Sequence, residues 1–347
     1  DFAQLFAARI LVGVGEATLT PSALSLISDS FSRQRAIRAV GLFTMGQSIG
    51  AGLAFLLGGQ VIALVSQSST VSWPLLGVLA PWQMTFILVG LPGVLVALLM
   101  LTIREPLRRG YQGARPAPGS LGRALGFLRS RIGTFGSLMI GNSVVTIIGY
   151  SYFWIPSMLA RTWGLDGATA GIWYGTVLAV FGPLGVISGA RLSEVLYRRG
   201  HSDAPYRVLT WSLLGGLPFA VAMPLMPSAW LTIVVLSPAM FALAMASATS
   251  SAAVVHVAPA EFRAQLSAAH ILVISLAGLF LGPTSVAMVT DYVLRDESLI
   301  RYSMASVTAV VGGLGLLVLL ASSATYRRSA TDADAWHRSR PAPGAAA

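Results

Sequence analysis

The chain has 347 residues, of which 55% are hydrophobic and 10% charged, and it contains no cysteine. A soluble domain needs more polar surface than this composition supplies, so a membrane protein is indicated, and disulfides, thiolate metal sites and cysteine nucleophiles are excluded. All 23 basic residues are arginine and the net charge is +10, so nucleic-acid binding has to be judged from where these charges lie.

Nine apolar stretches are long enough to cross a bilayer as single helices. In chain order they are residues 3–28, 38–64, 82–103, 135–160, 168–190, 207–226, 229–255, 266–290 and 303–323. Arginines gather in alternate connections between these stretches and in the C-terminal tail. The positive-inside rule places those connections and the C-terminus in the cytoplasm, so the charge reports topology and no nucleic-acid partner is expected.

The most basic connection, residues 104–134, divides the chain unequally. It holds seven arginines and a Pro/Gly-rich stretch, and it predicts a cytoplasmic linker whose LGRALGFLRSR segment suits an amphipathic surface helix. Residues 1–103 contain about three spans, the second half of a first bundle, and residues 135–328 contain a complete six-helix bundle. Residues 329–347 are polar and predict a disordered cytoplasmic tail.

The number of spans suggests a longer parent protein. An odd number of spans that ends inside places residue 1 outside, although no initiating Met or signal peptide precedes the first span. We therefore expect three further helices upstream, which gives about nine of twelve helices in this chain. The predicted fold class is an all-α polytopic membrane protein.

The first span carries two charges, Arg9 and Glu16, inside its apolar run. Intramembrane charges cost a few kcal/mol each and by default mark a substrate or proton pathway. The two residues lie about 10 Å apart on one helix face. Burial favours the neutral form of a carboxyl group, so Glu16 would take up and release a proton, with Arg9 biasing that step or holding an anionic substrate. The alternative is a static ion pair that fixes this helix against its neighbours.

Other spans hold weaker candidates. Asn142 and Tyr150 lie deep in the span 135–160 and are expected to line a cavity, and His270 is a further pathway candidate. Glycines of the second span, Gly46, Gly50, Gly52, Gly58 and Gly59, predict close helix packing through small-residue contacts. No residue spacing supports a metal site or a Ser-His-acid hydrolase, and no cofactor is expected.

The stretch ARILVGVGEATLTPSALSLISDSFSRQRAIRAVGLFTMGQSIGAGLAFLLGG resembles the fourth and fifth helices of the major facilitator superfamily, and in detail its Spinster-like branch. The shared pattern is an arginine, a G-x-G-E-A element, a proline and an aspartate at the helix end, here Arg9, residues 13–17, Pro21 and Asp29. The stretches PWQMTFILVGLPGVLVALL, YFWIPSMLARTWGL and VAPAEFRAQLSAAHILVISLAGLFLGP resemble the sixth helix, the end of the seventh, and the tenth loop with the eleventh helix. The family's first three helices have no counterpart.

The resemblance implies a secondary transporter of two helical bundles that moves a small organic, amphipathic or lipid-like solute by alternating access. It also implies gating by Asp29 and by the counterpart of the family's signature loop, where Glu194 keeps the acid and Val195 replaces the expected basic partner. Arg191, or Arg198 and Arg199, would substitute for that partner.

We therefore expect a proton-coupled carrier in a bacterial inner membrane, with an organic solute, protons and lipid as partners and no enzymatic activity. Two alternatives stay open. A receptor or scaffold of the same fold would have a filled cavity, and a membrane-embedded enzyme would need a pair of acid-base groups at a membrane face.

Overall fold

The computed structural model describes residues 2–30, 33–66, 71–73, 77–102, 120–259 and 262–339. Its first part contains three long helices and a hairpin, namely α1 (Phe2–Ser30), α2 (Arg33–Ser66), β1 (Val71–Trp73), β2 (Gly77–Leu79) and α3 (Pro81–Met100). The second part is helical throughout: α4 (Ser120–Ser130), α5 (Ile132–Ser151), η1 (Tyr152–Trp154), α6 (Ile155–Trp163), α7 (Gly167–Arg198), α8 (Ala204–Ala222), η2 (Met223–Leu225), α9 (Ala229–Val257), α10 (Arg263–Leu276), η3 (Ala277–Leu281), α11 (Gly282–Met288), η4 (Val289–Leu294), η5 (Glu297–Leu299) and α12 (Ile300–Ser339).

All nine predicted spans are helical, except for the described residues at two span ends, Leu101 and Thr102 after α3 and Met226 after η2. Seven helical stretches in the described part of the chain are long and apolar enough to cross a membrane, and α2 holds a shorter apolar stretch, Ile49–Val65. The antiparallel hairpin, with Val71 opposite Leu79, was not predicted. It is a minor addition to an all-α architecture.

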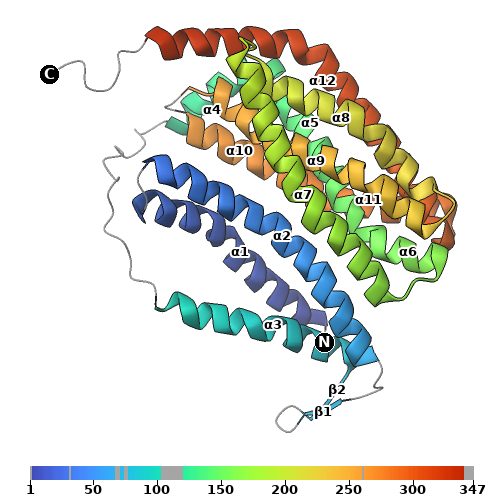
Figure 1. Cartoon of the computed structure of the whole chain (residues 1–347). Coiled ribbons are helices and arrows are strands. Elements are labelled where there is room, and N and C mark those ends of the chain that lie inside the picture. The colour runs from blue at the N-terminus through green and yellow to red at the C-terminus, as the bar shows by residue number, and fades with distance from the viewer. Residues whose placement is uncertain are drawn as a thin grey trace.

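The buried core lies in the second part of the chain, among α5, α7, α8, α9 and α12. Its largest enclosed side chains include four tyrosines, and Tyr206 stacks on Tyr326 at 4.4 Å between ring centres. By contrast, α3 lies at the edge of the fold in Figure 1 and exposes nearly all of its apolar side chains. Such a helix is suited to an apolar solvent such as lipid.

Local backbone conformation and a side-chain cap explain where α6 ends and where α7 begins. Gly164 adopts φ 66° and so ends α6 in a left-handed conformation that favours glycine. Asp166 then caps α7, because its carboxylate accepts hydrogen bonds from the backbone N–H and the hydroxyl of Thr169. These two bonds favour the charged carboxylate and lower the pKa of Asp166.

Glycines bring α2 directly against α7, and the two helices run side by side in Figure 1. A Cβ atom at Gly175 would lie 2.8 Å from the carbonyl oxygen of Gly52, and one at Gly171 would lie 2.7 Å from that of Phe55. Of the predicted glycine contacts on α2, Gly52 and Gly59 meet α7, whereas Gly46, Gly50 and Gly58 face open space. The two parts of the chain are therefore joined by a backbone-to-backbone crossing.

The predicted span 266–290 contains the π-helical segment η3 and the start of a second one, η4, on either side of α11. The first of them packs closely on α5. A Cβ atom at Gly278 would lie 2.7 Å from the ring of Tyr150, and one at Gly282 would lie 2.8 Å from the Tyr150 Cβ. These glycines let α5 approach, and the indole N–H of Trp154 donates to the Pro283 carbonyl at 3.0 Å.

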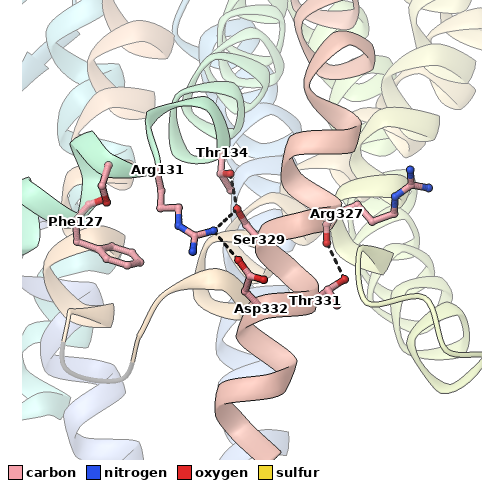
Figure 2. A network of polar contacts seen from close by, with 8 residues as sticks. Phe127, Arg131, Thr134, Arg327, Ser329, Thr331 and Asp332 are labelled. Atoms are coloured by element: carbon pink, nitrogen blue, oxygen red, sulfur yellow. Dashed lines mark hydrogen bonds and ion pairs between the residues drawn. The ribbon is translucent and has the colours of Figure 1, made fainter.

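The predicted disordered tail is wrong up to Ser339, because α12 continues through these residues, while residues 340–347 lie outside the described part. Figure 2 shows how the end of α12 is held. The Arg131 guanidinium donates to Asp332 at 2.9 Å and to Ser329 at 3.3 Å, and the hydroxyls of Thr134 and Ser329 are 2.8 Å apart. Buried Tyr326, Ala330 and Ala333 follow helical spacing, so this polar segment has an apolar stripe that packs.

This packing predicts a sharp effect at Ala330, whose side chain is 0% exposed. A glutamate there would bury an unpaired charge, so Ala330→Glu is expected to release the end of α12. Tryptic cleavage at Arg327 and Arg328 should become about tenfold faster, as local unfolding allows. The control is Thr331→Glu at the next, exposed position, and equal cleavage of the two variants would contradict the packing.

The predicted surface helix of the linker corresponds to α4, which is described from Ser120. Its exposed face carries Arg123 and Arg129, while Ala124 is buried and the Phe127 ring lies 5.9 Å from that of Phe135. The rest of the predicted linker, residues 104–119, lies outside the described residues.

Candidate functional site

A cleft of about 290 Å³ opens between α5, α7 and α9. Its wall is mostly apolar and carries three hydroxyl groups, those of Thr146, Tyr150 and Ser247. The lining residues are Val145, Thr146, Gly149, Tyr150, Phe153, Leu178, Gly182, Met240, Leu243, Ala244 and Ser247. A partly polar cleft among helices of a bundle is a typical small-molecule site.

Tyr150 is one of the residues that line this cleft. Its ring meets Phe153 edge-on at 5.3 Å between centres, and the contacts with Gly278 and Gly282 fix it from behind. Phe153 in turn lies 6.2 Å from Phe55 of α2, whose ring packs edge-on against Tyr174 at 4.6 Å. These aromatic contacts, which the sequence did not single out, connect the cleft to the α2–α7 crossing.

Glu16 of α1 lies close enough to Tyr150 for its carboxylate to interact electrostatically with the tyrosine hydroxyl. These two candidate residues, which are far apart in the sequence, therefore lie within electrostatic range of each other. The predicted burial of Glu16 is wrong for the described chain, because its side chain is exposed. The reason is that α1 packs along α2 and meets α3 near Arg9, while no described helix covers the Glu16 side chain.

Arg9 does not join Glu16. Its guanidinium carbon lies 6.0 Å from the centre of the Phe86 ring on α3, and its side chain is exposed. No ion pair connects Arg9 and Glu16 within the described residues, so the static pair considered from the sequence is not formed.

Asn142 and His270 meet in the interior of the second part of the chain. The Asn142 Nδ2 atom lies 3.1 Å from His270 Nε2, and Ser250 Oγ lies 3.5 Å from the same nitrogen. All three side chains are buried, and Asn142 Oδ1 and His270 Nδ1 have no hydrogen-bond partner. The sequence predicted Asn142 and His270 separately but gave no sign that they touch, and it missed Ser250, one of many serines in α9.

The predicted gating residues lie at helix ends. Arg191 and Glu194 are exposed near the end of α7, and Glu194 pairs with Arg198 one turn further along the same helix. An exposed pair of this kind contributes about 1 kcal/mol or less. Asp29 lies in the last turn of α1, and its side chain is outside the described part.

No group of three His, Asp or Glu side chains that could hold a metal ion occurs among the side chains that the structure describes. The chemistry of the site is thus that of hydroxyls, aromatic rings and one carboxylate around an apolar cleft.

Residues 1–283 match the family model described as the Major Facilitator Superfamily. The chain belongs to this superfamily. An MFS-type efflux pump of Mycolicibacterium smegmatis is 27% identical to it, over 94% of this chain and 72% of the pump. Protein spinster homolog 1 of Homo sapiens is 27% identical over 63% of this chain, and the match spans 42% of that protein.

A crystal structure of a bacterial homologue of the human lysosomal transporter Spinster, inward-facing and unoccupied, has the same fold. Its TM-score is 0.68 at 23% identity, and the match covers 99% of this chain and 80% of that one. The predicted superfamily and the likeness to Spinster are confirmed. Superfamily membership and the seven apolar helices identify an integral membrane protein, and the family points to a transporter and not to an enzyme.

Proposed function

We propose that the protein is a secondary active transporter that carries a small amphipathic organic solute through the cleft between α5, α7 and α9 by alternating access, coupled to protons through Glu16. The observation that carries this proposal is the partly polar cleft, one of whose lining residues, Tyr150, lies within electrostatic range of the Glu16 carboxylate. A receptor or scaffold of the same fold would need no such opening beside an intramembrane charge.

The chemistry of the cleft favours an amphipathic solute. Leu178, Met240 and Leu243 offer apolar surface, while the hydroxyls of Thr146 and Ser247 offer directional hydrogen bonds. A solute with an apolar body and one polar group could contact the apolar side chains and hydrogen-bond to the hydroxyls at the same time. Relatives named as an efflux pump and a Spinster homologue agree with an organic solute.

Alternation of arginine-rich connections supports a cytoplasmic C-terminus, and a bacterial inner membrane follows as the proposed location. In this topology α2 ends and α7 begins on the outer side, and we propose that their glycine crossing closes the cleft away from the cytoplasm. Alternating access would then separate α2 from α7. Asp29, Arg191 and Glu194 are proposed to act at the cytoplasmic gate.

The proposed proton step follows from the position of Glu16. A proton on Glu16 would neutralise the intramembrane carboxylate, which lowers the cost of moving α1 and α2 relative to the second part of the chain. Arg9, beside Phe86 and apart from Glu16, is proposed to attract the anionic group of a substrate before it reaches the cleft.

Transport by the natural full-length protein in proteoliposomes tests the proposal. With an imposed pH gradient, Glu16→Gln is expected to lower gradient-driven uptake at least about tenfold while exchange without a gradient continues, because the amide cannot take up the proton. Uptake of radiolabelled amphipathic solutes is the measurement. The matched control, Glu297→Gln, removes an exposed carboxylate that pairs with Arg161 at 3.1 Å, and it should transport like the wild type. Equal gradient dependence in all three proteins would remove Glu16 from the mechanism.

A further inference from the structure

Helices α5 and α9 line the cleft, and α10 packs against both of them. Residues of all three helices meet about one helical turn away from the cleft. Thr146 of α5 lines the cleft and donates its hydroxyl to the Ile274 carbonyl of α10 at 3.0 Å. Four residues before each of these positions come Asn142 and His270. On α9, Ser247 lines the cleft and Ser250 follows three residues later. The cluster of Asn142, Ser250 and His270 therefore lies about 5 Å along the helices from the cleft.

The orientation of the Asn142 amide implies the protonation state of this cluster. The Asn142 Nδ2 group is a donor only, so His270 Nε2 accepts, the imidazole is neutral, and its proton is on Nδ1. That N–H has no acceptor, and Asn142 Oδ1 has no donor. His270 is 1% and Asn142 is 2% exposed, so both orphan atoms are enclosed. Buried polar atoms without partners are uncommon in proteins and call for an explanation.

We propose that this cluster is a second proton-binding site, in which His270 Nε2 takes up the proton. Once protonated, Nε2 becomes a donor and loses the bond from Asn142 Nδ2. The Asn142 amide then turns over, so that its vacant Oδ1 accepts from Nε2, and Ser250 Oγ is a second acceptor at hand. The proton comes from water in the cleft and returns to it, and no other bond is made or broken. This inference rests on the proposed transport function and adds to it a proton site distinct from Glu16.

The surroundings of His270 decide when the proton can enter. The titratable or charged groups on the helices packed against it are Tyr150 of α5, His256 of α9, Arg263 of α10, and Arg123 and Arg129 of α4. No carboxylate occurs in the described residues of these four helices. Only dipoles stabilise an imidazolium there, so the closed cluster favours neutral histidine and proton uptake requires that water reach it. Protonation is thereby linked to opening of the cleft.

Hydrogen–deuterium exchange at the imidazole C2 position, followed by mass spectrometry across a pH series, tests this directly in the natural full-length protein in nanodiscs. We expect His270 to exchange at least about tenfold more slowly than His201, which lies in the connection between α7 and α8, and to show a step with pH. Asn142→Asp places a carboxylate beside Nε2 and should move the midpoint of that step up by about one pH unit or more. The control Ser251→Ala, at the exposed neighbour of Ser250, should leave the midpoint unchanged.

A His270 signal without any step between about pH 4 and pH 9 in both wild type and Asn142→Asp would overturn the inference. The inference would also be overturned if Asn142→Asp left the pH midpoint of the His270 step unchanged. The readout needs no transport, so the two proposals fail separately. If His270 titrates but the protein shows no proton-driven uptake, only the proposed transport is contradicted. If the protein shows proton-driven uptake but His270 does not titrate, only the second proton site is contradicted.

Discussion

Replacing Gly175 with leucine is expected to separate α2 from α7 and to stop transport. The new side chain would start 2.8 Å from the Gly52 carbonyl oxygen, and backbone cannot move aside as a flexible side chain can. Overpacking of this kind costs about 1–3 kcal/mol, and about 2 kcal/mol corresponds to a roughly 30-fold shift between the closed and the open crossing. In the proposed mechanism the α2–α7 crossing closes the outer side of the cleft. The cleft of the variant is therefore expected to stay open on that side.

The native absence of cysteine makes this measurable, because an engineered pair has no competing thiol. Gly167 and Ile62 approach where α7 begins and α2 ends, and a Cβ atom on the glycine would lie 4.0 Å from Ile62 Cγ2. The double change Ile62→Cys and Gly167→Cys should form a disulfide readily. Adding Gly175→Leu should slow its formation at least about tenfold.

Gly215 supplies the control, since a Cβ atom there would meet nothing within 4 Å. Gly215→Leu is expected to cross-link and transport as the parent does. Unchanged cross-linking and uptake in Gly175→Leu would show that the glycine crossing is dispensable for closing the cleft.

Filling the cleft is the second change with a large expected effect. Ser247→Trp adds an indole to the wall that α9 contributes, so solute uptake should fall at least about tenfold. Folding should be retained, because Ser247 is exposed and a bulky side chain there meets open space in the cleft.

Uptake and thermal unfolding of the same preparations would be compared with those of Ser251→Trp. Ser251 lies one turn further along α9 and is exposed without lining the cleft, so this control carries the same bulk elsewhere. A Ser247→Trp variant that transports as fast as its control would place the solute pathway outside the cleft between α5, α7 and α9.

The helices of this chain were predictable because a long apolar run can satisfy its backbone hydrogen bonds within a bilayer by forming a helix. The end of α12 shows where composition misleads. Residues 329–339 are polar on average, yet Tyr326, Ala330 and Ala333 recur at helical spacing and are buried. A search for that period would have found the stripe, whereas an average over the segment could not.

Of the residues that line the cleft, the sequence analysis named only Tyr150 as a cavity residue. Polar residues in apolar runs stand out, which is why Glu16, Tyr150, Asn142 and His270 were proposed as candidates, but their arrangement could not be predicted. Their contacts are tertiary: Asn142 and His270 are separated by 128 positions, and no periodicity reports such a pairing. The exposure of Glu16 was missed for the same reason, because burial depends on which helices cover α1.

The π-helical turn at η3 gives the helix behind Tyr150 a way to move without unfolding. Removing one residue from such a widened turn converts it to ordinary α-helix, which rotates the following segment by about 100° and shifts it by about 1.5 Å. Gly278 and Gly282 would swing away from the tyrosine ring, and bulkier neighbours such as Leu279 and Leu281 would take their places. A one-residue change of register at η3 would thus replace the glycines that pack on Tyr150 by leucines and displace the Tyr150 ring, which lines the cleft.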